Sequence, residues 1–255
     1  MCFETDARPP LPPIRGAAVD GRELRLTSRD GTEFAAYGAR AERPSGAGVV
    51  IIPDVRGLHP YYEELALRFA EAGVHAVAID LLARTAGVGK RGEGFEHEPH
   101  VMQLKAGSVN DDVAAGVAHL RSVEGGEPER AYSVGFCLGG RISFLQAAAG
   151  LGLDGVIGFY GWPAGEHRTG LPAPADEAPR FASPVLAIYG GADQGIPEPM
   201  RATFDRALDA ASVEHRSIVY DGAPHSFFDR KATEFAEASA DAWRQVLDFM
   251  EVGPT

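Results

Sequence analysis

The sequence is poor in cysteine, in long apolar runs and in positive charge. It has two cysteines among 255 residues, which excludes a secreted fold held together by disulfides. No stretch approaches the roughly 20 apolar residues that cross a bilayer, and no basic segment followed by an apolar run opens the chain. Lysine and arginine number 24 against 36 acidic residues, and the net charge of −12 disfavours nucleic acid as a partner. We therefore expect a cytoplasmic protein that binds neither membranes nor nucleic acid.

Short apolar runs alternate with amphipathic stretches along most of the chain. Residues 1–20 are rich in proline and predict an extended arm, and residues 21–255 predict a single domain. The alternation predicts an α/β fold, with a mainly parallel, doubly wound sheet of about eight strands and helices on both faces. Residues 81–100 and 162–183 predict loops. The predicted strands are 23–28, 33–40, 48–53, 75–79, 130–136, 155–160, 184–189 and 213–220, and the predicted helices are 61–72, 108–121, 138–149, 198–211 and 232–251.

The turn between the predicted strand 130–136 and the helix after it reads Gly-Phe-Cys-Leu-Gly-Gly, with Cys137 at its centre. This is the pattern of a nucleophile elbow, with cysteine in place of serine. Glycines two residues before and after Cys137 leave room for a turn in which any Cβ would clash. A buried structural cysteine is the alternative interpretation. A dinucleotide-binding turn is excluded, because the G-x-G-x-x-G spacing is missing.

A nucleophile of this kind needs a histidine and an acid from later loops. Asp193 follows the strand 184–189, where the acid is expected, although a turn or a helix cap would also explain an aspartate there. His225 is the one histidine between the last predicted strand and the last predicted helix. Asp221 and Asp229, both near that histidine, compete with Asp193 for the acid role.

An oxyanion site is expected beside Cys137. The Leu138 N–H points into the space above the turn, and the Val55 N–H after the strand 48–53 is the candidate for the second donor. Asp54 could hydrogen-bond the thiol, or it could cap its own turn. Trp162 and Phe227 follow strand ends and are candidates for the pocket wall, with core packing as the alternative.

From Glu33 to Met250 the sequence resembles the dienelactone hydrolase (carboxymethylenebutenolidase) family of the α/β-hydrolase fold. The resemblance rests on GFCLGG, VVIIPDVRGLHPYYEELALRFAEAG, AIDLLART, YGGADQGIP and GAPHSFFDR. It implies a Cys–His–Asp triad of Cys137, His225 and Asp193 that works without metal or cofactor. It further implies that arginines bind a substrate carboxylate: Arg84 falls on one such position, and Arg230 lies one residue beyond another.

These observations predict a hydrolase that cleaves an activated ester or enol lactone through an acyl-enzyme. Arg84, with Arg56 or Arg230, favours an acidic small-molecule substrate. A broad carboxylesterase or thioesterase is one alternative, and a thiol redox sensor on the same fold is another. The sequence leaves open whether the chain forms a homo-oligomer.

Overall fold

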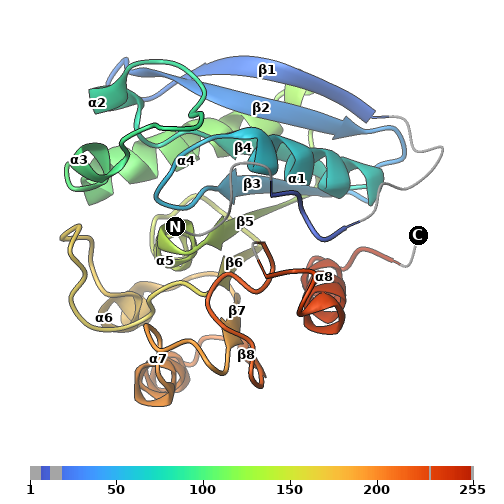
Figure 1. Cartoon of the computed structure of the whole chain (residues 1–255). Helices are drawn as coiled ribbons and strands as arrows, with labels where there is room; N and C mark the ends of the chain where they lie inside the picture. Colours follow the sequence, from blue (N-terminus) through green and yellow to red (C-terminus); the bar gives the residue numbers. More distant parts are fainter. Residues whose placement is uncertain (1–6, 12–18, 230, 254–255) are drawn as a thin grey trace.

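The computed structural model describes residues 7–11, 19–229 and 231–253, with one continuous sheet at the centre. The 8-stranded sheet has the order β1-β2-β4-β3-β5-β6-β7-β8 and extends from β1 at the top of Figure 1 to β8 at the bottom. β2 pairs antiparallel with β1 and β4, and all other neighbours pair parallel. The predicted α/β fold is confirmed. The strands are β1 (Val19–Thr27), β2 (Glu33–Ala41), β3 (Ala47–Ile52), β4 (His75–Ile79), β5 (Arg130–Phe136), β6 (Gly155–Phe159), β7 (Val185–Gly190) and β8 (His215–Tyr220).

The parallel strands are apolar because helices cover both faces of the sheet. Every residue of β3, β4, β6 and β7 is buried, as a strand covered on both sides requires. The edge strand β8 has only exposed and half-buried residues instead. The hairpin of β1 and β2 turns at Gly31, whose φ of 83° suits glycine. Because β3 to β8 run parallel, their carboxyl ends lie at one edge of the sheet, where functional loops gather.

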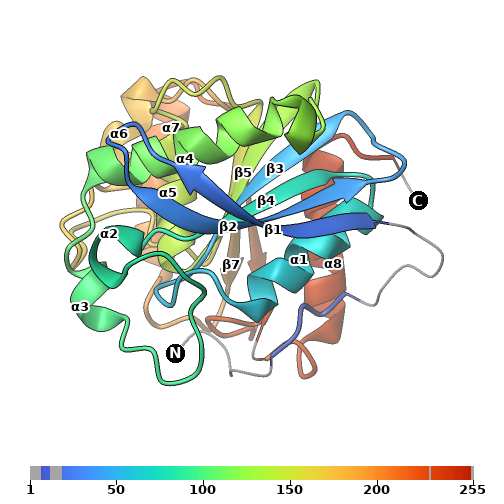
Figure 2. The ribbon, with the colours of Figure 1, turned by 90° about the horizontal axis from the view of Figure 1, so that it is seen from above.

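Helices cover both faces of the sheet, as Figures 1 and 2 show. On the first face the rings of Phe69 and Trp243, which come from two helices, lie 4.7 Å apart. On the second face, Gln146 Nε2 donates to Asn110 Oδ1 at 3.1 Å and joins two of the helices. The first face carries α1 (Pro60–Glu71) and α8 (Ala236–Phe249), and the second carries α4 (Ala106–Leu120), α5 (Leu138–Gln146) and α7 (Glu198–Ala210).

Some boundaries differ from the prediction. α4 begins at Ala106, so the acids expected in its first turn lie one turn later, where Asp112 is buried against Ser28 Oγ at 2.7 Å. α8 begins at Ala236 rather than at 232, because residues 231–235 form turns. The predicted loops contain the short helices α2 (Ala83–Ala86), α3 (Glu98–Val101) and α6 (Pro174–Glu177), and 3-10 turns lie at Val123–Gly125 and Ala178–Arg180.

The predicted N-terminal arm is described only in part. Leu11 is 9% exposed and belongs to the core, and Arg8 forms an ion pair with Glu64 of α1. β1 begins at Val19, just inside the range predicted for the arm. In the described ranges, no helix has the length and apolar character needed to cross a membrane.

Acid should destabilise this fold partly through His59, just before α1. Burial, and next the charge of Arg56, lower the pKa of His59 to about 3. His59 therefore takes up a proton near pH 6.5 in the unfolded chain but stays neutral in the folded chain until the pH approaches 3. The stability that His59 contributes above pH 6.5 is lost as the pH falls towards 3. We expect His59 to account for about 2 kcal/mol of the stability lost between pH 7 and pH 5. Urea unfolding of His59→Gln at both pH values should show a correspondingly smaller loss than the wild type, and an equal loss in both would refute this account.

Candidate active site

Cys137 lies in a strained turn between β5 and α5. Its φ of 55° and ψ of −114° lie outside the regions that L-residues favour, and its N–H donates to the Phe159 carbonyl at 3.0 Å. A Cβ on Gly135 would lie 1.9 Å from the carbonyl oxygen of Gly139. A Cβ on Gly139 would lie 2.2 Å from the carbonyl oxygen of Ile52, at the end of β3. The two glycines therefore let the turn close tightly and let α5 begin against the neighbouring strand.

His225 and Asp193 come from the loops after β8 and β7 and meet above this turn. His225 Nδ1 lies 2.6 Å from Asp193 Oδ2, and Asp193 Oδ1 accepts the Gly195 N–H at 2.9 Å. The neutral imidazole thus donates from Nδ1 and carries its lone pair on Nε2. The rings of Tyr160 and Trp162 lie 4.8 and 5.1 Å from that of His225. This arrangement can accept a proton at Nε2 while the carboxylate fixes the tautomer.

The two competing acids lie elsewhere. Asp229 is buried and accepts the Tyr160 hydroxyl at 2.9 Å. Burial and the charge of Asp229 raise the pKa of Tyr160 well above its usual value. Asp221 is exposed in the turn after β8. Of the three candidate acids, Asp193 is therefore the one that the structure pairs with His225.

A cavity of about 610 Å³ opens above the turn. It brings together Cys137, Leu138, Val55, His225 and Trp162, which the sequence singled out. Arg84, Arg56, Asp54 and Phe227 are not among the described residues of its wall. The remaining lining residues are His97, Glu166, His167, Arg168 and Met200.

Four of these added residues, His97, Glu166, His167 and Arg168, come from segments without regular periodicity, whereas Met200 lies in α7. His97 directly precedes α3, and the next residue, Glu98, pairs with Arg168 across the cavity. Burial, and the nearby charges of Arg56 and Arg168, lower the pKa of His97. For these four residues, the loop character of residues 81–100 and 162–183 is the sequence signal. Loop character does not say which side chains face the cavity.

Arg84 does not serve the cavity as the sequence suggested. Its guanidinium pairs with the buried Asp112 at 2.5 Å and with Asp30 at 3.0 Å, and it donates to Ser28 Oγ at 3.0 Å. These partners belong to the β1–β2 hairpin and to α4, and Arg84 is not among the described residues that line the cavity of Cys137. The prediction that Arg84 binds substrate is therefore not supported at this cavity.

The structure places three of the other four predicted site residues, Asp54, Arg56 and Phe227. Asp54 is buried, and its Oδ1 accepts the Arg56 N–H at 2.8 Å as in an Asx-turn, so its contact with the thiol stays a prediction. Arg56 is half-buried at this turn. Phe227 is fully buried and packs 5.2 Å from the ring of Tyr220, which is the core-packing alternative. Arg230 lies outside the described residues.

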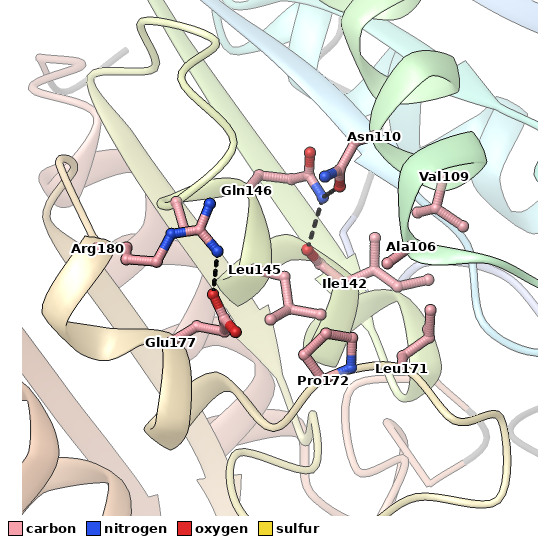
Figure 3. Close-up of a pocket in the computed structure, with 11 residues that line it drawn as sticks. Ala106, Val109, Asn110, Ile142, Leu145, Gln146, Leu171, Pro172, Glu177 and Arg180 are labelled. Atoms are coloured by element: carbon pink, nitrogen blue, oxygen red, sulfur yellow. Dashed lines mark hydrogen bonds and ion pairs between the residues drawn. The ribbon is translucent and has the colours of Figure 1, made fainter.

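A smaller cavity of about 120 Å³ lies between α4, α5 and residues 171–180 (Figure 3). Ile142, Leu145 and Pro172 surround it, and a pair between Glu177 and Arg180 lies at one side. Neither Cys137 nor His225 belongs to the described residues that line it. This cavity and the one that contains Cys137 share no described lining residue.

The chain is similar in sequence to proteins of one family. The family model described as "Dienelactone hydrolase family" matches residues 34–252. A Salmonella typhimurium protein named "Putative carboxymethylenebutenolidase" is 32% identical over 254 residues, covering 95% of this chain and 93% of its own. A Yersinia pestis protein of the same name is 31% identical over 227 residues, covering 86% and 84%.

Solved structures show the same fold. A crystal structure titled "Putative Dienelactone Hydrolase", from Klebsiella pneumoniae subsp. pneumoniae, has a TM-score of 0.76 at 28% identity and covers 92% of this chain and 99% of its own. A dienelactone hydrolase-like promiscuous phosphotriesterase from metagenomic libraries has a TM-score of 0.77 at 22% identity, with the same coverage. The protein is thus an α/β hydrolase that acts on ester bonds. It belongs to the dienelactone hydrolase family.

Proposed function

We propose that this hydrolase cleaves an activated ester or enol lactone through a thioester on Cys137. The observation that carries the proposal is that Cys137, His225, Leu138 and Val55 all line one cavity. A strained turn presents the thiol, an imidazole oriented by a carboxylate is present, and two backbone positions flank the space for an oxyanion. These are the parts that acyl transfer needs.

The reaction has two halves. His225 Nε2 takes the thiol proton, and Cys137 Sγ attacks the carbonyl carbon while the Leu138 and Val55 N–H groups bind the oxyanion. The C–O bond to the leaving group breaks, and the imidazolium returns the proton to the departing oxygen. A water molecule then gives a proton to His225 and attacks the thioester, which releases the acid and restores the thiol. Thiolate catalysis favours substrates with good leaving groups, such as enol lactones and activated esters.

An acidic substrate would find its cation in the cavity wall. Arg168 takes the place that the sequence gave to Arg84, since Arg168 lines the cavity and Arg84 does not. Glu98 pairs with Arg168, so a substrate carboxylate would have to displace or share that partner. We therefore keep acidic esters and lactones among the candidate substrates.

Rapid mixing with p-nitrophenyl acetate tests the thioester. We expect a burst of p-nitrophenolate close to one per protein, and mass spectrometry of the quenched protein should find one acetyl group on Cys137. Cys137→Ala should give neither. Steady turnover by Cys137→Ala would overturn the proposal. Absence of a burst with activated esters, lactones and acyl thioesters, together with reversible oxidation of Cys137, would favour the thiol sensor.

A further inference from the structure

Arg141 lies in the first turn of α5 with its side chain inside the protein. It is 0% exposed, and its N–H donates to the Cys137 carbonyl at 3.2 Å. Burial lowers the pKa of Arg141 to about 10, which leaves it charged at neutral pH. No acid in the described part of the chain forms an ion pair with it, although the charge of Asp176 acts on it. A buried guanidinium without a paired carboxylate must be stabilised by other groups.

Those groups are backbone carbonyls. Arg141 Nη1 donates to the Trp162 carbonyl at 3.0 Å. Arg141 Nη2 donates to the carbonyls of Gly165 at 3.1 Å and Leu171 at 3.0 Å. The three acceptors lie at the start, middle and end of residues 162–171, which form neither helix nor strand. Because the guanidinium is planar with donors in fixed directions, one side chain holds the whole segment in one arrangement.

The segment that Arg141 holds forms one wall of the catalytic cavity. It supplies Trp162, Glu166, His167 and Arg168 to the lining. The Trp162 ring also lies against His225. A shift of residues 162–171 would therefore change the shape of the cavity and the packing around the histidine. Cys137 lies on the turn before α5, where its N–H donates to the Phe159 carbonyl at 3.0 Å.

We propose that Arg141 is a positioning residue that fixes residues 162–171 as the cavity wall and thereby limits which acyl groups the site accepts. It acts through carbonyls and does not touch the substrate. Its effect on selectivity rests on the proposed function, whereas its effect on the segment does not.

Arg141→Met tests, without any substrate, whether Arg141 fixes residues 162–171. Methionine fills much of the same volume but cannot donate to the three carbonyls, so amide hydrogen exchange in residues 162–173 should become about tenfold faster, with β5 and β6 unchanged. Arg121→Met is the matched control. Arg121 also donates to two carbonyls, those of Leu151 and Gly152, in a loop that does not line the cavity. Arg121→Met should leave exchange in 162–173 at the wild-type rate. Unchanged exchange in Arg141→Met would overturn the proposal.

Kinetics with two esters test whether Arg141 limits which acyl groups the site accepts. In Arg141→Met, kcat/KM for p-nitrophenyl hexanoate should fall about tenfold more than kcat/KM for p-nitrophenyl acetate. Both esters share any effect on His225, but only the longer acyl chain reaches the displaced wall. Arg141→Lys should give smaller changes in exchange and in this ratio, since one ammonium cannot reach all three acceptors, and it serves if the methionine variant does not fold. Equal losses on both esters would indicate a merely structural role and refute the selectivity. A wild type inactive on both esters would contradict the proposed function, and the exchange result would still decide the role of Arg141.

Discussion

Replacing Asp193 with asparagine should lower kcat/KM for activated esters by about 10³-fold. Asp193 Oδ1 accepts the Gly195 N–H and Oδ2 faces His225 Nδ1. Asparagine that keeps the bond to Gly195 turns its NH₂ group towards Nδ1, and the imidazole then carries its proton on Nε2. In that tautomer Nε2 cannot take the thiol proton. The variant also lacks the negative charge that stabilises the imidazolium.

Asp229→Asn is the matched control for this prediction. Asp229 is also buried and lies four residues after His225, but its carboxylate accepts from Tyr160, and an asparagine oxygen can do the same. We expect it to change kcat/KM by less than about tenfold. Steady-state kinetics on both variants, with urea unfolding to confirm that each is folded, makes the comparison. A larger loss in Asp229→Asn than in Asp193→Asn would show that the acid has been assigned to the wrong residue.

Some residues of the site could be predicted from the sequence alone. Cys137 could be found because a strand, a tight turn and a helix are local, and their glycines have a steric cause. His225 and Asp193 could be found because parallel strands bring the loops after their carboxyl ends to one edge of the sheet. Both steps depend on the order of elements along the chain. Neither depends on the packing of individual side chains.

Arg84 shows where such reasoning fails. Its position after β4 places its backbone near the functional edge of the sheet, but the direction of its side chain depends on Asp112 and Asp30. Those acids are distant in sequence, and the register of α4 decides whether Asp112 reaches it. α4 begins two residues before the predicted start, and the sequence alone does not fix the register that brings Asp112 to Arg84.

The cavity wall was missed for a different reason. Residues 162–171 have no period, so the sequence gives no rule for which side chains face the site. Their arrangement depends on Arg141, which the sequence places within an otherwise ordinary helix. Buried arginines bonded to carbonyls leave no pattern in the sequence, and only the structure can identify them.

Gly139→Ala should damage both the fold and the site, because two elements meet at this glycine. A Cβ there would lie 2.2 Å from the carbonyl oxygen of Ile52 and 2.3 Å from that of Pro53. Both contacts are with backbone, so the end of β3 or the start of α5 must move. We expect a loss of at least about 2 kcal/mol in the free energy of unfolding, as overpacking of a core typically costs. The movement displaces one of the two proposed oxyanion donors, Val55 after β3 or Leu138 at the start of α5, and kcat should fall by about 10²-fold in the molecules that remain folded.

Gly107→Ala is the control, since a Cβ at Gly107 meets nothing within 4 Å. Its position in α4 lets alanine stabilise the helix by up to about 1 kcal/mol, and kcat should not change. Urea unfolding gives the two stabilities, and active-site titration of the folded protein separates a lower kcat from a smaller folded fraction. If Gly139→Ala were as stable and as active as Gly107→Ala, the close approach of α5 to β3 would not be what shapes this site. If it lost stability but kept kcat, the placement of the Val55 and Leu138 N–H groups would not limit catalysis, because relief of the clash moves the element that carries one or the other.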